Sequence, residues 1–175
     1  IYETCVDSIV WVQSGIGRGS GFFIEEDVVL TNHHVIEGAT QLYIIMENGD
    51  TADVLEVLGY APELDIAVLR VDYKAEPLPF NTHGITVGEK TYAIGNPLGI
   101  SFSFSDGIVT NRELIHDEAK AFLTNTPISS GNSGGPLLNE YGEVMGLTTA
   151  GFTAGQNLNI VVNIDQLELV DLSKP

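Results

Sequence analysis

The sequence predicts an all-β fold made of two packed six-stranded Greek-key β-barrels, followed by a short C-terminal helix. Apolar residues alternate or cluster in short runs separated by Gly, Asn, Asp and Pro, and they almost nowhere recur at helical spacing over three turns. These runs also fall into two sets of six, the pattern expected of two small antiparallel barrels. A chain of 175 residues is long enough for one well-buried domain or for two small barrels sharing an interface.

The first set of strands is expected before residue 72, with turn-forming residues at 25–27 and 47–50 between them. Its members are 8–13, 21–25, 28–31, 41–46, 52–59 and 66–71. The second set, with a hairpin turn at 139–142, comprises 90–94, 103–111, 121–125, 135–138, 143–149 and 158–162. Only the tail at 165–172 has the character of a helix.

A looser stretch with Pro77, Pro79 and Asn81 interrupts the strand pattern and indicates the crossing between the two halves. We therefore expect four parts in one unit. They are a first barrel over about 1–75, a linker over about 76–88, a second barrel over about 89–163 and a helix over about 164–172.

Composition narrows the possible partners. The chain carries 7 Lys and Arg against 24 Asp and Glu, a formal charge of −17, which would repel nucleic acid and anionic lipid. The same charge promotes solubility, and it also suits the attraction of basic or unfolded polypeptides or life in salt. No stretch is long and apolar enough to predict a membrane span.

The low cysteine content and the absence of the usual ligand motifs predict that the protein binds no cofactor. The single Cys5 excludes an intramolecular disulfide, so packing alone is expected to hold the fold. The sequence has no Gly-Lys-Ser/Thr phosphate loop, no His-Glu-x-x-His pair and no cysteine cluster. We therefore expect neither a nucleotide nor a catalytic metal.

The run Gly-Asn-Ser-Gly-Gly-Pro at 131–136, centred on Ser133, is the main chemical motif. Acyl transfer from a serine hydroxyl needs a base, a group that orients the base, and donors aimed at the developing oxyanion. Flanking glycines let the backbone turn sharply, so that the N–H groups of Gly131, Asn132 and Ser133 are candidates for an oxyanion hole. On its own, the run also fits an ordinary turn between strands.

Two runs in the first half supply candidates for the other groups. Thr-Asn-His-His-Val at 31–35 ends a predicted strand, and Leu-Asp-Ile-Ala-Val-Leu follows at 64–69. Among the many carboxylates, Asp65 is enclosed by apolar residues and Asp72 less so, and an enclosed acid should be buried beside a partner. The N–H of a histidine ring is such a partner.

Together these runs resemble the HtrA (Deg) branch of the trypsin-like serine proteases, whose fold is the chymotrypsin-like double barrel. That branch uses a Thr-Asn-x-His-Val run for the base, an Asp-x-Ala-Val-Leu run for the orienting acid and a Gly-Asn-Ser-Gly-Gly-Pro-Leu run for the nucleophile. The resemblance spans most of the chain and includes similar runs at 19–22, 94–99, 107–109 and 156–159. It implies the roles base, acid and nucleophile for His34, Asp65 and Ser133, with His33 a bystander.

The resemblance also implies a serine endopeptidase that cuts unfolded or flexible polypeptides in the periplasm or another extracytoplasmic location. Such proteases often form trimers through residues near the N-terminus, which makes Ile1 and Tyr2 candidates for a homotrimer contact. The sequence carries no PDZ module after the protease region, and the loops at 15–17 and 112–121 are expected to be short.

Residues just before the serine form the floor of the specificity pocket in trypsin-like folds, and here they are Pro127 and Ile128. No Asp is available there to pair with Lys or Arg, so an apolar P1 side chain of small or medium aliphatic size is expected. Further substrate contacts are expected from Asn159 and Ile160 in the opposite wall, with Ile160 limiting the depth, and from Thr148, Thr149 and Ala150 pairing with an extended peptide.

Two other functions remain open from the sequence. One is a peptide-binding or chaperone module that keeps the barrels without the chemistry. The other is a dedicated processing protease with a single partner, which short loops and the lack of a PDZ module would suit.

Overall fold

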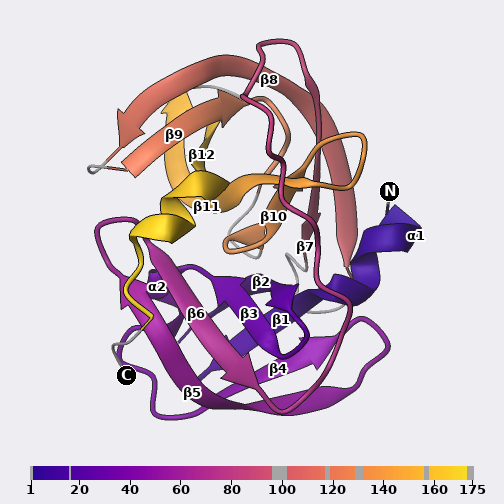
Figure 1. Ribbon diagram of the computed structural model, residues 1–175, viewed down its shortest axis with the longest axis vertical. Coiled ribbons are helices and arrows are strands. Elements are labelled where there is room, and N and C mark those ends of the chain that lie inside the picture. The colour runs from indigo at the N-terminus through magenta and orange to yellow at the C-terminus, as the bar shows by residue number, and fades with distance from the viewer. Residues whose placement is uncertain are drawn as a thin grey trace.

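The structure, a computed structural model, describes residues 2–15, 17–95, 102–116, 119–128, 132–155 and 158–172. Its strands form two closed six-stranded barrels that lie one above the other in Figure 1. Every pairing between named strands is antiparallel. The predicted all-β double-barrel fold is therefore confirmed.

The first barrel closes in the order β1-β2-β3-β6-β5-β4. Its strands are β1 (Ile9–Ser14), β2 (Arg18–Glu25), β3 (Val28–Thr31), β4 (Leu42–Met46), β5 (Thr51–Ala61) and β6 (Ile66–Val71). The second barrel closes in the order β10-β11-β12-β9-β8-β7. Its strands are β7 (Lys90–Gly95), β8 (Ser103–His116), β9 (Ala119–Thr124), β10 (Pro136–Leu138), β11 (Val144–Gly155) and β12 (Leu158–Asn163).

Helical segments are short. They are α1 (Tyr2–Cys5), the 3-10 helix η1 (Val6–Ser8), α2 (His33–Ile36) and the 3-10 helix η3 (Ile164–Leu169). The helix expected near the C-terminus is thus present as a 3-10 helix, with Asn163 accepting a hydrogen bond from the N–H of Asp165 at its start. After η3 the chain returns to the first barrel, where the carbonyl of Asp171 lies against Gly59 of β5 (Figure 1).

Most strand ends agree with the prediction to within three residues, and two depart from it by more. We expected a strand to end at residue 111 and a loop to follow, but β8 continues to His116 and forms a ribbon with β9. We also expected a strand to end at residue 149, whereas β11 continues to Gly155. Arg112, Glu113 and Ile115 of the β8 extension are exposed, so this ribbon lacks the alternation of apolar and polar residues that marks a half-buried strand.

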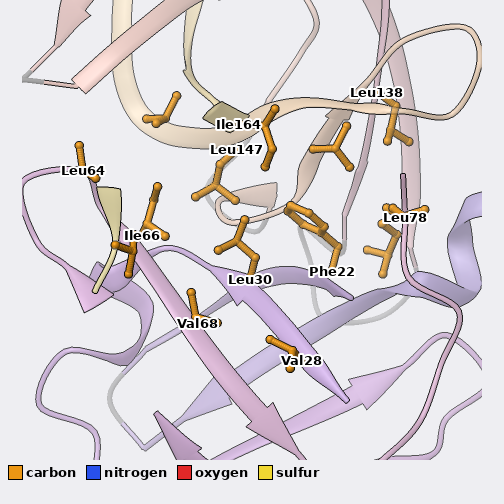
Figure 2. Close-up of a cluster of buried hydrophobic side chains, with 14 of the residues drawn as sticks. Phe22, Val28, Leu30, Leu64, Ile66, Val68, Leu78, Leu138, Leu147 and Ile164 are labelled. Carbon is orange, nitrogen blue, oxygen red and sulfur yellow. The ribbon is translucent and has the colours of Figure 1, made fainter. Parts of the chain in front are cut away.

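Three main apolar clusters hold the molecule together, one inside each barrel and one between the barrels. Strands at the contact between the barrels are therefore buried on both faces. Adjacent side chains of β2 show this: Phe23 packs inside the first barrel, whereas Phe22 packs between the barrels. Figure 2 shows Phe22 and Leu30 pointing toward Leu147 and Ile164 of the second barrel. A third cluster, around Phe122, fills the second barrel.

The segment between β6 and β7 binds both barrels. The N–H of Leu78 donates to the carbonyl of Phe23 in the first barrel, and the N–H of Val144 in the second barrel donates to the carbonyl of Pro79. This strap fixes the two barrels beside each other. The division into domains at about residues 75 and 88 stays a prediction.

Candidate active site between the barrels

The histidine and the aspartate come from two different turns of the first barrel and meet at its edge. His34 lies on the single helical turn α2 directly after β3, and Asp65 ends the tight turn before β6. Oδ1 of Asp65 accepts a hydrogen bond from the backbone N–H of His34 at 2.8 Å, and Oδ2 lies 2.7 Å from its ring Nδ1. A carboxylate only accepts, so Nδ1 carries a proton and Nε2 faces away from Asp65 as the basic nitrogen.

The backbone of Asp65 takes an unusual conformation, with φ of 55°. Among residues other than glycine, aspartate and asparagine enter this left-handed region at the lowest cost. Its N–H donates to the carbonyl of Pro62 at 3.1 Å, which closes the turn. The conformation directs the carboxylate toward the α2 turn, where the two bonds to His34 offset the strain.

The environment of His34 favours its charged form. The hydrogen bond with Asp65 raises the pKa of His34 above the ordinary value of 6.5, and partial burial opposes this rise. The negative charges of Asp65 and Glu37 add to the increase in the pKa. About half of the His34 side chain, 46%, remains exposed, so the ring is accessible from solvent.

Ser133 enters the site from the second barrel. Its Oγ lies 3.2 Å from Nε2 of His34, and the residue is 2% exposed. The first barrel also holds its backbone, because the N–H of Ser20 in β2 donates to the carbonyl of Ser133 at 2.7 Å. The serine is thus positioned by both barrels.

Glycine is required directly after the serine. Gly134 has φ of 93°, and a Cβ at this position would lie only 2.1 Å from the carbonyl oxygen of Ser20. Its N–H donates to the carbonyl of Thr148 at 2.9 Å, which ties the turn to β11. The turn can approach β2 so closely only because no side chain stands between them.

The candidates for the oxyanion hole are described in part. Gly131 lies outside the described residues. The carbonyl of Asn132 accepts from the N–H of Gly135 at 2.9 Å and from the Thr148 hydroxyl at 2.8 Å, so this peptide points its oxygen into the protein. The predicted role of Gly131, Asn132 and Ser133 stays a prediction.

The residues expected to shape the substrate pocket occupy different places. Pro127 is exposed and Ile128 is half-buried, on the segment that leads to the serine turn. Asn159 of β12 joins this segment, since its Nδ2 donates to the carbonyl of Thr126 at 2.9 Å. The side chain of Ile160, the next residue, packs in a separate small cluster with Leu123 and two other apolar residues. The side chains of Asn159 and Ile160 therefore do not lie together.

The strand expected to pair with a peptide, residues 148–150, lies in β11. The Thr148 hydroxyl is buried and donates to main-chain carbonyls of the serine turn, so this side chain supports the turn from inside. Thr149 is also buried. The backbone groups of this stretch are therefore the candidates for pairing with a substrate.

Some residues around the site received no role from the sequence. Asn32, which is fully buried, contacts both Ser133 and Asp65. Asn32 stands in the Thr-Asn-His-His-Val run at 31–35, but that run gave a role to its histidine alone. His33, expected to be a bystander, stacks on Tyr60 with 5.2 Å between ring centroids, and its Nδ1 lies 4.0 Å from the carboxylate of Glu37.

No group of three or more His, Cys, Asp or Glu suited to a metal occurs in the part of the chain that the structure describes. In the same part, no helix is long and apolar enough to cross a membrane.

Two closed antiparallel barrels, with serine, histidine and aspartate side chains meeting between them, define the double-barrel class of serine proteases. Sequence comparison agrees, because residues 19–147 match the trypsin-like peptidase domain. The chain belongs to the trypsin-like serine peptidases, in their HtrA/Deg-like branch.

Known proteins illustrate the relationship. A DegP-like periplasmic serine endoprotease of Chlamydia trachomatis is 38% identical over 142 residues, covering 76% of this chain and 28% of that protein. The chloroplastic Protease Do-like 1 of Arabidopsis thaliana is 35% identical over 173 residues, covering 86% of this chain and 39% of that protein. A solved serine endoprotease from Yersinia pestis superposes with a TM-score of 0.83 at 28% identity, covering 96% of this chain and 62% of that chain.

The sequence matches cover most of this chain but less than half of each relative. The chain spans between about a quarter and two fifths of the length of the two sequence relatives. The match therefore concerns only part of each relative.

Proposed function

We propose that this chain is a serine endopeptidase in which Ser133 is the nucleophile, His34 the general base and Asp65 the group that orients the base. The observation that carries the proposal is a continuous series of contacts. Oδ2 of Asp65 lies 2.7 Å from Nδ1 of His34, and Nε2 of the same ring lies 3.2 Å from Oγ of Ser133. These distances suit a relay in which the ring takes the serine proton.

The chemistry follows from these groups. Ser133 Oγ attacks the scissile carbonyl while its proton passes to Nε2 of His34, and Asp65 stabilises the imidazolium that forms. The imidazolium then gives the proton to the leaving amine, and a water repeats the sequence to release the acyl group. Backbone N–H groups of Gly131, Asn132 and Ser133 are the proposed donors to the oxyanion.

The proposed specificity is for a small or medium aliphatic P1 side chain. Pro127 and Ile128 on the segment before the serine offer apolar surface and no carboxylate. Asn159 supports this proposal by holding the preceding carbonyl of Thr126. Residues 148–150 are the proposed partners of an extended peptide backbone.

The proposed substrates are unfolded or flexible polypeptides. The charge of −17 supports a polypeptide substrate over nucleic acid, because it repels phosphate groups and attracts basic segments. Relatives named as periplasmic support a periplasmic or other extracytoplasmic location. A homotrimer that uses Ile1 and Tyr2 stays part of the same proposal.

Labelling with a serine-directed phosphonate tests the proposed nucleophile. We expect the parent protein to be labelled on Ser133 and Ser133→Ala to remain unlabelled while keeping its fold by circular dichroism. A parent protein that is well folded but stays unlabelled would refute the proposed endopeptidase activity and favour a peptide-binding module. A peptide library then distinguishes broad aliphatic P1 cleavage from the single-substrate cleavage of a processing protease.

A further inference from the structure

Asn32 joins the nucleophile to the loop that carries the acid. It lies between the end of β3 and the start of α2 and is fully buried. Its Nδ2 donates to the backbone carbonyl of Asp65 at 2.9 Å, and its Oδ1 accepts a hydrogen bond from Oγ of Ser133 at 2.5 Å. One side-chain amide thus bridges two of the three proposed catalytic residues.

The orientation of this amide follows from its partners. A backbone carbonyl can only accept a hydrogen bond, so the NH₂ group of Asn32 must face the carbonyl of Asp65. The amide oxygen must then face Ser133, where it can only accept. Hence Asn32 competes with Nε2 of His34 for the single proton of the Ser133 hydroxyl.

Two acceptors compete for this proton when His34 is neutral. Oδ1 of Asn32 and Nε2 of His34 both lie within hydrogen-bond distance of Ser133 Oγ, but the hydroxyl has one proton to donate. When His34 is an imidazolium, the competition ends. Nε2–H then donates to Oγ, and the hydroxyl donates to Asn32, so all the groups are satisfied at once.

We propose that Asn32 is a positioning residue that holds the hydroxyl of resting Ser133 by its amide oxygen and, through this hydroxyl, favours the protonated state of His34. The inference rests on the proposed role of Ser133 and His34 and assigns Asn32 a function of its own. The hydroxyl must rotate from Asn32 toward Nε2 before attack. Asn32 therefore sets both the resting geometry and the pH range of activity.

Other charged groups near His34 act by different routes. Asp65 binds the ring directly, and Glu37 on α2 acts through its charge. His33, the neighbouring residue on α2, lies 4.0 Å from the same Glu37 carboxylate. Asn32 carries no net charge, and its proposed effect on the protonation of His34 passes through its hydrogen bond with Ser133.

Titration of His34 by NMR, in the parent protein and in Asn32→Leu, tests the inference without needing activity. Leucine resembles asparagine in shape but accepts no hydrogen bond, and Asn32→Ala is a second variant that cannot crowd the site. We expect the pKa of His34 to fall by about 0.5–1 unit in either variant, a shift typical of the loss of one hydrogen bond. The pH midpoint of phosphonate labelling should fall by the same amount.

The same substitution in the Ser133→Ala background separates the proposed route from a general effect on the Asp65 loop. Without the hydroxyl, Asn32 has no connection to His34 through Ser133, so the shift between asparagine and leucine should disappear. An equal shift in both backgrounds, or no shift in a folded variant of the parent, would overturn the inference.

Asn139→Ala provides the matched control. Asn139 is a buried asparagine in the hairpin before β11, where its side chain bonds to Glu143 and to neighbouring backbone. We expect its loss to lower stability and to leave the pKa of His34 and the labelling midpoint unchanged. If the parent is not labelled at all, the proposed function fails while the titration still decides the role of Asn32.

Discussion

Both oxygens of the Asp65 carboxylate bind His34, one at the backbone N–H and one at the ring, although 31 positions separate the two residues. A carboxylate bound only to the ring would orient the imidazole without binding the main chain of the α2 turn. The second bond fixes the main chain of His34 as well, so the ring keeps one tautomer and one direction toward Ser133. Four predictions follow from this site and the contacts around it.

Activity should depend on pH in a direction set by His34. We expect phosphonate labelling to fall as the pH drops through a midpoint above 6.5, because the base must be neutral and its pKa is raised. The sign for stability is opposite. A pKa that is higher in the folded state stabilises the protein fully below 6.5, and this contribution disappears as the pH rises through the folded pKa. Labelling rates and melting temperatures measured from pH 5 to 9 should therefore change in opposite directions across this window, apart from the other groups that titrate there.

Asp65→Asn should abolish most of the activity with little effect on the fold. An amide in place of the carboxylate can donate to the ring and favour the wrong tautomer, for which we expect a loss of about ten-thousand-fold in kcat. The pKa of His34 should fall at the same time. Asp72→Asn, at the exposed carboxylate just after β6, is the control and should keep parental kinetics. Comparable kinetics in the two variants would assign the orienting role to another group.

Gly134→Ala should lower stability far more than Gly49→Ala, a substitution with the same backbone strain at a position where the added Cβ has free space. Gly49 has the same φ of 93° as Gly134, but a Cβ there meets nothing within 4 Å. We expect Gly49→Ala to cost about 1 kcal/mol, and Gly134→Ala to cost about 3–5 kcal/mol because its Cβ would meet Ser20. Urea unfolding measures both costs, and Gly134→Ala should also prevent labelling. Equal costs would show that the contact with β2 is not tight.

Asn159→Ala should weaken peptide binding more than it weakens the chemistry. The change leaves the carbonyl of Thr126 without its bond from Asn159 and loosens the segment that carries Pro127 and Ile128. We expect KM for peptide substrates to rise about tenfold, with a small change in labelling by a compact phosphonate. Steady-state kinetics on an aliphatic P1 peptide decide this, and an unchanged KM would place the pocket wall elsewhere.

Much of the fold follows from the sequence, because strands buried on both faces leave strong apolar runs. β3 and β6 have the predicted bounds for this reason. The extension of β8 beyond residue 111 was missed because its exposed side chains carry no alternation. The α2 turn was also missed, since four residues give no helical period and its position depends on bonds from Asp65 across the fold.

The site was predicted unevenly. His34, Asp65 and Ser133 were expected from motifs and their order, and the structure brings them together. Asn32 stands inside one of those motifs, but its function depends on two partners, Ser133 and the carbonyl of Asp65, which only the folded chain places on either side of its amide. Ile160 shows the converse, since the alternation of a strand puts it on a different face from its neighbour Asn159.

The bond from Ser20 to the carbonyl of Ser133 has a consequence for a protein that would digest unfolded chains, including its own kind. The proposed base and acid are made first, with the early barrel, and the proposed nucleophile arrives with the later one. Under these roles, neither half of the chain carries all three groups. Cleavage would therefore require a molecule that has completed and docked both barrels.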